Sequence, residues 1–352
     1  MNILQINTEK TWRGGEKQTL LTAEGLTALG NRVEILCRKG HPLAHKATQR
    51  HILCHEVGNS LQAMAFLTAH GSSFDILHAQ TAKAQSAAVL TKPFHRTPIV
   101  YTRRVDFKPR GLPARFKYRH TDKVVAISQA IAQVLDDFGV ANDRVIPSAI
   151  DLRAPVPSPP KHIADNILKQ KHAGKKIILS IAALVPHKDP YTMIKAAKQL
   201  HIDEPKAMFF HCGSGNLEPD ITRLVLKAGL QKCYFLLGFV DNAEGLLPLA
   251  DVFVMSSQEE GLGSTVLEAF RHKIPVATTN AGGLKEIVPG HGLVSPIHEP
   301  KELARNIQYL LSDTELAQSL VAKAYDYVCT HHAHETMASR YLTLYQSMFQ
   351  NN

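Results

Sequence analysis

The sequence lacks several features that would place it in common protein classes. No stretch of about 18 apolar residues occurs in its 352 residues, so no membrane-spanning helix is predicted. The first residues carry neither the basic segment nor the apolar core of a signal peptide. The five cysteines are odd in number and none has C-x-x-C spacing, which argues against a disulfide framework and a zinc finger. We therefore expect a cytoplasmic protein that meets a membrane only at its surface.

The motifs of several enzyme classes are also missing. There is no G-x-x-x-x-G-K-[ST] loop for nucleoside triphosphates and no G-x-S-x-G nucleophile turn. The first predicted strand is not followed by G-x-G-x-x-G, which excludes a nicotinamide-binding fingerprint. Neither H-E-x-x-H nor D-x-D occurs, so no metal site is predicted.

The charge is unevenly distributed. The formal net charge is +9, and residues 1–155 hold 21 Lys and Arg against 12 Asp and Glu. Residues 156–352 hold 19 of each kind, so the whole excess lies in the first half. This indicates an anionic partner there, such as phosphate or a membrane surface. No nucleic-acid-binding motif is present, and the second half is neutral, so we expect no nucleic-acid partner.

Short apolar runs alternate with helical patterns along the chain, which predicts α/β domains with parallel sheets. The proline-rich residues 154–160 form a linker candidate. We expect an N-terminal domain over 1–155, a C-terminal domain over 156–335, and a final helix over 336–352 that crosses back. A cleft between two such domains is a common place for ligands. The expected strands are 2–6, 32–37, 75–78, 99–102 and 124–127, then 176–182, 207–212, 234–237, 252–255 and 276–278.

Two glycine-containing segments are candidates for anion binding. Gly14 and Gly15 stand between the first strand and a helix expected from Glu16, where the backbone can approach a ligand; a plain turn is the other interpretation. The second segment, 257–270, places Glu260 and Glu268 around a glycine loop and a helix start. Ser264 or Thr265 can cap that helix, with Glu268 in about its first turn. The alternative here is an ordinary cap beside a surface glutamate.

The second segment resembles the E-x7-E motif of the retaining glycosyltransferases of family 4, and other segments agree. These are Gly14-Gly15, 125–128, 146–151, 211–215, 235–240, 250–254, 274–278 and 282–288, so the resemblance covers about residues 1–325. It implies the GT-B fold, in which two Rossmann-like α/β/α domains face each other across a cleft.

The resemblance also implies residue roles. Glu260 would contact the donor sugar, Glu268 the ribose, and Lys188 the diphosphate, with Glu260 and Lys188 as the catalytic residues. The donor-binding set would be Gly14, Gly15, Gly213, Ser214, Phe239, Val240, Gly261, Leu262, Gly263, Ser264, Thr265 and Glu268. No metal or other cofactor is implied, because basic side chains and a helix start neutralise the leaving diphosphate.

The chain departs from the family pattern at three places. Ala183 replaces the usual arginine of the diphosphate site, and Arg13 and His187 are the candidates to compensate. Arg103 stands where a histidine is often found, and Ser148-Ala149 replaces an Asn-Gly pair. No role is carried over to Arg103 from that histidine.

Residues 103–119 form a basic segment with interleaved apolar side chains. Its seven cations are Arg103, Arg104, Lys108, Arg110, Arg115, Lys117 and Arg119. One interpretation is an acceptor-side surface that docks on anionic lipid or on a phosphorylated glycolipid. The other is a solvated helix face.

Together these features predict a retaining, metal-independent glycosyltransferase. Its donor would be a nucleotide diphosphate sugar, and its acceptor a hydroxyl of a bacterial lipopolysaccharide or other cell-surface glycolipid intermediate. The chain would be cytoplasmic and peripheral on the inner face of the membrane. Two alternatives remain open on the same fold: a nucleotide-sugar epimerase, and a non-catalytic relative that binds glycans or anions.

Overall fold

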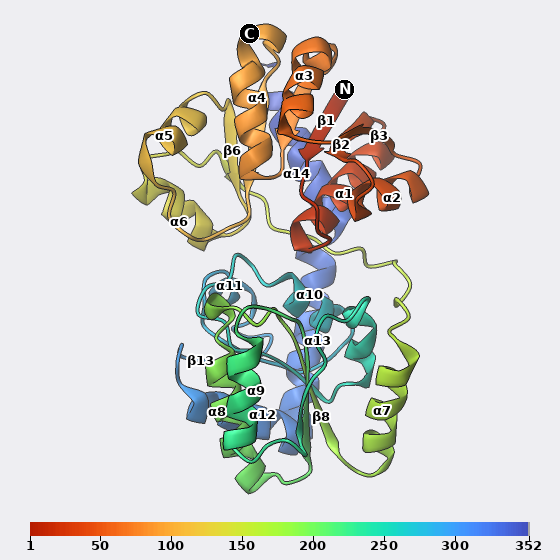
Figure 1. The fold of residues 1–352 in the computed structure, drawn as a ribbon, viewed down its shortest axis with the longest axis vertical. Helices are drawn as coiled ribbons and strands as arrows, with labels where there is room; N and C mark the ends of the chain where they lie inside the picture. Colours follow the sequence, from red (N-terminus) through yellow and green to blue (C-terminus); the bar gives the residue numbers. More distant parts are fainter. Residues whose placement is uncertain (351–352) are drawn as a thin grey trace. The chain divides into compact units, whose positions relative to one another are not determined.

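The computed structural model describes residues 1–350 and divides the chain into two compact units (Figure 1). Unit 1 comprises Met1–Asp151 together with the segment from His332 onwards. Unit 2 comprises Leu152–His331. The chain therefore passes from one unit to the other twice, and each unit is built on its own parallel sheet.

Unit 1 contains a seven-stranded sheet with the strand order β3-β2-β1-β4-β5-β6-β7. Its strands are β1 (Asn2–Asn7), β2 (Arg32–Arg38), β3 (Leu53–Val57), β4 (Ile76–Ala79), β5 (Ile99–Arg103), β6 (Lys123–Ala126) and β7 (Arg144–Val145). Its helices are α1 (Gly14–Ala28), α2 (Pro42–Gln49), α3 (Ser60–His70), η1 (Gly71–Ser73), α4 (Ala82–His95), α5 (Gly111–Arg119), α6 (Gln129–Asp137) and α14 (His334–Ser347). The central strands β4 and β5 are buried at every residue, as expected for a parallel sheet covered by helices.

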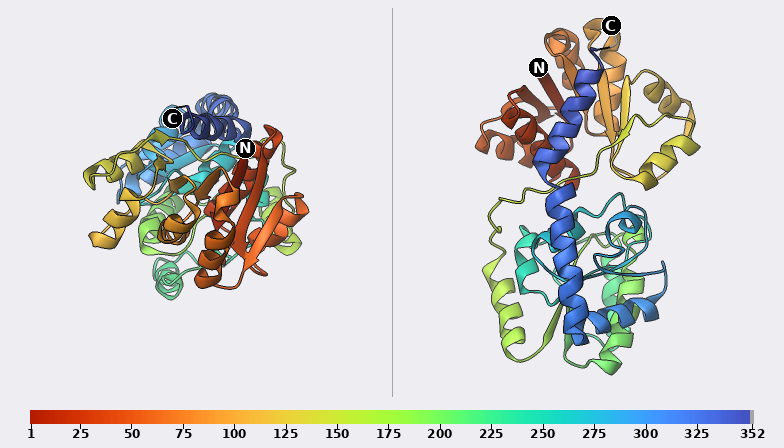
Figure 2. Two further views of the ribbon diagram at one scale, coloured as in Figure 1. Left: turned by 90° about the horizontal axis from the view of Figure 1, so that it is seen from above. Right: turned by 180° about the vertical axis from the view of Figure 1, so that it is seen from behind.

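The C-terminal helix α14 packs against α1 and inserts two tyrosines into the core of unit 1, along the path that Figure 2 shows from behind. The Tyr345 hydroxyl lies 2.7 Å from Nδ1 of His78, and the Tyr341 hydroxyl lies 2.9 Å from Thr102 Oγ1. Thr102 in turn bonds Nε2 of His78 at 2.8 Å. Burial holds the pKa of His78 well below its ordinary value, so this histidine is a neutral, hydrogen-bonded core residue.

Unit 2 contains a six-stranded sheet with the order β10-β9-β8-β11-β12-β13. Its strands are β8 (Lys176–Ile181), β9 (Ala207–Cys212), β10 (Tyr234–Leu236), β11 (Val252–Met255), β12 (Val276–Thr279) and β13 (Leu293–Ser295). Its helices are α7 (Lys161–His172), η2 (Pro186–Lys188), α8 (Pro190–Asp203), α9 (Glu218–Lys227), η3 (Ala243–Leu249), α10 (Ser264–Arg271), α11 (Leu284–Ile287), α12 (Pro300–Ser312) and α13 (Thr314–His331).

The strand order of unit 2 locates its ligand-binding edge. From β8 the chain first moves outward through β9 and β10, then returns to the other side of β8 with β11. The strand order therefore reverses between β8 and β11. In open α/β sheets, ligands bind at the carboxyl ends of the strands beside such a reversal. The loops after β8 and β11 carry Lys188 and Glu260.

The structure moves the expected domain boundaries by a few residues. Residues 152–155, assigned from the sequence to the N-terminal domain, belong to unit 2, where Arg271 donates a hydrogen bond to the Ala154 carbonyl. Residues 332–335, assigned to the C-terminal domain, belong to unit 1, where the Ile150 N–H donates to the His332 carbonyl at 2.8 Å. Residues 351 and 352 of the expected final helix lie outside the described residues.

Candidate functional site

Lys188 and Glu260 meet at the carboxyl edge of the unit 2 sheet. Lys188 ends η2, after β8, and Glu260 lies in the loop after β11. The Lys188 ammonium forms an ion pair with Oε2 of Glu260. The two side chains are 20% and 13% exposed, so both remain within reach of a ligand. The structure thus brings together the two residues expected to be catalytic.

Asp189 holds Lys188 in place. It adopts a left-handed backbone conformation (φ 43°) that few residues other than glycine tolerate, and it caps α8 by accepting a hydrogen bond from the Thr192 N–H at 3.1 Å. The Ser256 hydroxyl donates to the Asp189 carbonyl at 2.9 Å. The end of β11 therefore anchors the loop that presents Lys188.

The loop before Glu260 is tied to the same segment. The Gln258 N–H donates to the His187 carbonyl at 3.0 Å, and Nε2 of Gln258 donates to the Pro186 carbonyl at 2.9 Å. The imidazole of His187, a candidate to replace the missing arginine, lies exposed beside Lys188 in sequence. One backbone and one side-chain hydrogen bond thus join the two halves of the site.

Two glycines that follow β12 shape the Glu260 loop. The Gly283 N–H donates to the Glu260 carbonyl at 2.8 Å. Gly282 has φ +45°, and a Cβ there would lie 2.0 Å from the Glu260 carbonyl oxygen. A Cβ on Gly283 would lie 2.4 Å from the Gly261 carbonyl oxygen. Sequence reasoning noted this glycine pair only as part of a motif, but the backbone of the site requires both residues.

Helix α10 begins differently from the sequence prediction. Its N-cap is Gly263 (φ +93°), not Ser264 or Thr265, which occupy the first two helical positions. The predicted hydroxyl cap is wrong because the left-handed glycine already turns the chain into the helix. The backbone N–H groups of Ser264 and Thr265 have no hydrogen-bond partner among residues 1–350. Such free N–H groups at a helix start attract anions.

Glu268 is the fifth residue of α10, at the start of its second turn and close to the predicted place, because the helix starts at Ser264. Its side chain is 7% exposed, and the Arg271 guanidinium lies 3.5 Å from Oε2. Leu262, predicted for the donor set, is buried beneath this loop, whereas Gly261 is partly accessible. The buried carboxylate is thus a fixed, charge-stabilised acceptor.

The loops after β9 and β10 lie at the same edge. A Cβ on Gly213 would stand 1.9 Å from the Ala182 carbonyl oxygen, so the backbone of Ala182 and Ala183 passes directly beside this glycine. The Gly213 N–H donates to the Gly238 carbonyl at 2.7 Å. Of the other predicted residues here, Ser214 is exposed, Phe239 is 75% exposed and Val240 is buried.

His211 supports this edge from below; in the sequence it stands out only as part of the motif at 211–215, without a role of its own. Its Nε2–H donates to the Ala182 carbonyl (2.9 Å), and Nδ1 accepts from the Tyr234 hydroxyl (3.0 Å). Burial lowers the pKa of His211 to about 4, so the ring is neutral at neutral pH and holds this tautomer. The signal available in the sequence was a histidine inside an apolar strand.

In unit 1, the glycine pair lies inside a helix. Gly14 and Gly15 are the first two residues of α1, which starts two residues before the predicted position because Glu16 accepts a hydrogen bond from the Arg13 N–H (2.8 Å) and closes the first turn. A Cβ on Gly15 would lie 4.0 Å from Cδ of Arg104. The structure therefore brings the glycine pair and Arg104 together, which sequence reasoning did not foresee.

The basic segment divides into two groups. Lys108, Arg110, Arg115 and Arg119 are exposed, with Lys117 partly so. Arg103 is buried, where its guanidinium donates to the Tyr118 hydroxyl (2.8 Å) and the Phe107 carbonyl. Arg103 is therefore unavailable to a surface partner, in contrast to the expectation from its charge. Arg104 is partly buried and points into unit 1.

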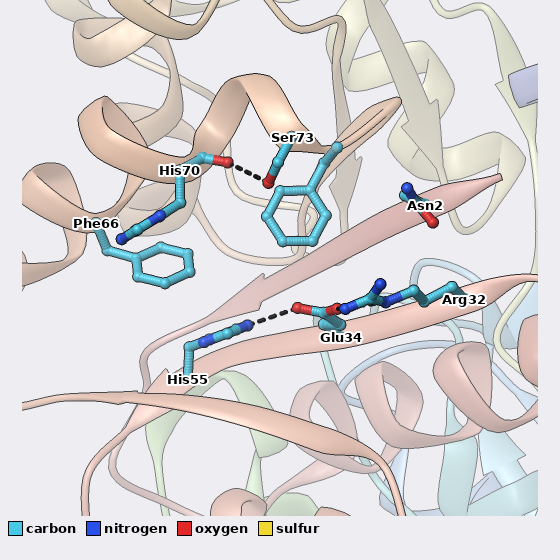
Figure 3. Close-up of a pocket in the computed structure, with 8 residues that line it drawn as sticks. Asn2, Arg32, Glu34, His55, Phe66, His70 and Ser73 are labelled. Carbon is cyan, nitrogen blue, oxygen red and sulfur yellow. Dashed lines mark hydrogen bonds and ion pairs between the residues drawn. The ribbon is translucent and has the colours of Figure 1, made fainter.

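A cavity of about 410 Å³ lies at the opposite, amino-terminal edge of the unit 1 sheet (Figure 3). Glu34 forms one wall, and its carboxylate is paired with Arg32 at 2.8 Å and with His55 at 2.6 Å. None of the predicted site residues lines it. Its charges are neutralised internally, and we assign it no part of the donor chemistry.

Residues 1–350 contain no cluster of three His, Cys, Asp or Glu side chains suited to a metal ion. Across the same residues, no helix combines the length and apolar character needed to cross a membrane.

Family models match both units. The model described as glycosyl transferases group 1 matches residues 164–327, and the model described as glycosyltransferase family 4 matches residues 12–154. The first model covers the loops that carry Lys188, Glu260 and Glu268. The second covers the glycine pair and the basic segment.

Relatives and solved structures agree with these matches. The lipopolysaccharide core biosynthesis glycosyltransferase LpsE of Rhizobium meliloti is 26% identical over 239 residues, 67% of either chain. The putative glycosyltransferase EpsD of Bacillus subtilis is 30% identical over 46% of this chain and 44% of its own. The fold matches that of HepE from Anabaena, solved with UDP-glucose, with a TM-score of 0.86, 20% identity, and coverage of 99% of this chain and all of that one.

Proposed function

The chain belongs to the group 1 glycosyltransferases with the GT-B fold, and we propose that it is a retaining, metal-independent enzyme acting through Lys188 and Glu260. Glycosyltransferase activity on a nucleotide sugar follows from the family. The finer statements about mechanism and acceptor are our proposal. The observation that carries it is the ion pair between Lys188 and Glu260 beside the uncapped start of α10.

Departure of a nucleoside diphosphate develops negative charge on its phosphate oxygens, so charge stabilisation is the main catalytic task. The Lys188 ammonium supplies one positive charge. The free N–H groups of Ser264 and Thr265 add hydrogen bonds and the positive end of the helix dipole. The side chain of Ala183 contributes no charge, so Lys188 carries a larger share than in relatives with an arginine there.

The two glutamates have different tasks in this account. Donor phosphate competes with Glu260 for the Lys188 ammonium, which leaves the Glu260 carboxylate to accept hydrogen bonds from sugar hydroxyls. Glu268 is buried and paired with Arg271, which suits a fixed acceptor for the vicinal hydroxyls of a ribose. Gly282 and Gly283 allow the backbone after β12 to contact the Glu260 carbonyl closely, which fixes the position of the Glu260 loop.

Retention and metal independence need a direct test. We expect the anomeric configuration of the sugar to be the same in donor and product, as followed by proton NMR of the first product formed. We also expect the initial rate to survive exhaustive treatment with EDTA. An inverted product would overturn the retaining assignment, and loss of activity that Mg²⁺ or Mn²⁺ restores would overturn metal independence.

The acceptor we propose is a lipopolysaccharide or other cell-surface glycolipid intermediate. LpsE aligns with this chain over two thirds of its own length and is described as acting in lipopolysaccharide core biosynthesis. The excess positive charge of residues 1–155 also favours an acidic acceptor. Incorporation of radiolabelled sugar into lipopolysaccharide precursors, with neutral oligosaccharides as the comparison, tests this choice.

We further propose that α5 and the loop before it dock on an anionic membrane surface. Phe107 is 62% exposed, Leu112 is 81% exposed and Phe116 is 48% exposed. The cations Lys108, Arg110, Arg115 and Arg119 surround these apolar side chains in sequence and are exposed too. Exposed apolar side chains beside a basic cluster are typical of interfacial helices.

A further inference from the structure

Arg104 lies at the ligand-binding edge of the unit 1 sheet. It follows β5 directly, and its guanidinium contacts Gln80, which follows β4. Gly15, beside its Cδ, is in the helix after β1. The strand order of this sheet reverses between β1 and β4, so these three residues gather where open α/β sheets bind ligands.

The partners of the Arg104 guanidinium are all neutral. Nη2 donates to Oε1 of Gln80 at 2.7 Å, and Nη1 donates to the Ser148 hydroxyl at 3.3 Å. The Tyr341 hydroxyl is a third neutral neighbour. Nε is buried and has no hydrogen-bond partner, and no carboxylate lies within 4.0 Å, in the part of the chain that the structure describes.

This environment is costly for a cation removed from water. Partly buried charges are normally paired with an opposite charge, since desolvation is costly. The mostly buried Arg271 pairs with Glu268, whereas the buried Arg103, like Arg104, bonds only neutral groups, the Tyr118 hydroxyl and the Phe107 carbonyl. Burial lowers the pKa of Arg104 from its ordinary value, and the nearby Glu16 only partly offsets this without forming an ion pair. An incoming anion would relieve the cost.

We propose that Arg104 binds a phosphate group in unit 1. This proposal rests on the proposed function only for the identity of the molecule that carries the phosphate. Each Nη of the partly exposed Arg104 carries a second hydrogen beyond its bond to Ser148 or Gln80, and such directional donors are what phosphate oxygens accept. The carrier is either the acceptor, as a phosphorylated glycolipid, or the donor diphosphate. Gln80 and Ser148 hold the guanidinium in position for it.

The experiment observes binding at Arg104 itself and needs no turnover, so its failure is distinct from a failure of the proposed function. In protein labelled with ¹⁵N-arginine, the Nε–H resonance of Arg104 is assigned by its loss in Arg104→Gln. Glycerol 3-phosphate and UDP are then titrated separately, and Arg144→Gln, an exposed arginine of unit 1, is the matched control. A melting curve for each variant without ligand checks folding.

We expect the Arg104 resonance to shift with at least one probe, and Arg104→Gln to weaken that probe's affinity by about 10-fold or more while Arg144→Gln leaves it unchanged. A response to glycerol 3-phosphate identifies an acceptor phosphate, and a response to UDP alone identifies the donor diphosphate. An unperturbed Arg104 resonance with both probes, in folded protein, overturns the proposal and leaves Arg104 a structural residue.

Discussion

Lys188 and Glu260 form an ion pair although 72 residues separate them in the chain. The pairing follows from topology, because the loops after β8 and β11 are neighbours where the strand order of unit 2 reverses. Each group neutralises the other until a ligand arrives. A nucleotide diphosphate sugar offers a better partner to each, with phosphate for the ammonium and hydroxyls for the carboxylate.

Gly282→Ala is expected to disturb the Glu260 loop, because its Cβ would collide with the Glu260 carbonyl oxygen. Gly290→Ala is the matched control, since Gly290 also has a positive φ (+80°) but has open space around its Cβ position. Both variants should lose about 1 kcal/mol of unfolding free energy to backbone strain, and Gly282→Ala should lose more because of the collision. Only Gly282→Ala should also lose activity, as measured by initial rates. Equal activity in the two variants would contradict the role of this close contact.

Glu268→Gln is expected to raise the KM for the donor by about 10-fold and to change kcat little, because it weakens a binding contact remote from the bond that breaks. Glu302→Gln in α12 is the control, since Glu302 also pairs with an arginine three residues later (Arg305, 2.9 Å) but its side chain is 39% exposed. Steady-state kinetics with varied donor separate the two constants. A fall in kcat at unchanged KM would remove Glu268 from ribose binding.

His211 makes stability depend on pH in a defined direction. Its pKa is about 4 in the folded chain and 6.5 in the reference state, so the unfolded chain binds more protons between these values. Stability is therefore complete above about pH 6.5 and falls with decreasing pH by up to about 1.4 kcal/mol per unit. Chemical denaturation of His211→Gln should show a shallower pH dependence than the exposed control His172→Gln. Identical slopes in both would contradict the buried, neutral assignment.

Docking of α5 on lipid predicts salt-sensitive binding. The chain should bind vesicles of phosphatidylcholine and phosphatidylglycerol, and Arg110→Gln/Arg119→Gln should lower the partition coefficient by about 30-fold, at about 1 kcal/mol for each cation. Lys195→Gln/Lys198→Gln, on an exposed face of α8 in unit 2, is the control. Cosedimentation at several salt concentrations measures the effect. Binding that does not respond to salt, or no binding at all, would refute the proposed surface.

The sequence predicted the regular core better than its edges. Strands β9 and β11 match the predicted bounds, because both are continuous apolar runs. Strand β3 was missed because it is an edge strand with exposed positions and polar residues at His55 and Glu56, and β7 because it has only two residues. Local sequence patterns predict strands that are buried on both faces. They do not predict strands that form only because a neighbouring strand pairs with them.

Site residues could be predicted from the sequence where their role depends on residue type. They could not be predicted where the role depends on which residues the fold places beside them. Lys188 and Glu260 were identified through a motif, and the fold brings them together. Arg103 and Arg104 are adjacent residues of the same type, yet Arg103 bonds Tyr118 in the core and Arg104 lies beside Gly15. The cap at Gly263 was missed because its left-handed backbone is not visible in a sequence that offers two hydroxyls next to it.

The central claim is that Lys188 and Glu260 carry the donor chemistry. It is tested most directly by nucleoside diphosphate release from UDP-, GDP- and ADP-sugars, compared among Lys188→Ala, Glu260→Ala and the exposed neighbour control Glu259→Ala. We expect kcat/KM for the accepted donor to fall by about 100-fold or more in the first two variants, with Glu259→Ala close to the unmodified chain. Full activity in Lys188→Ala or Glu260→Ala would contradict the account.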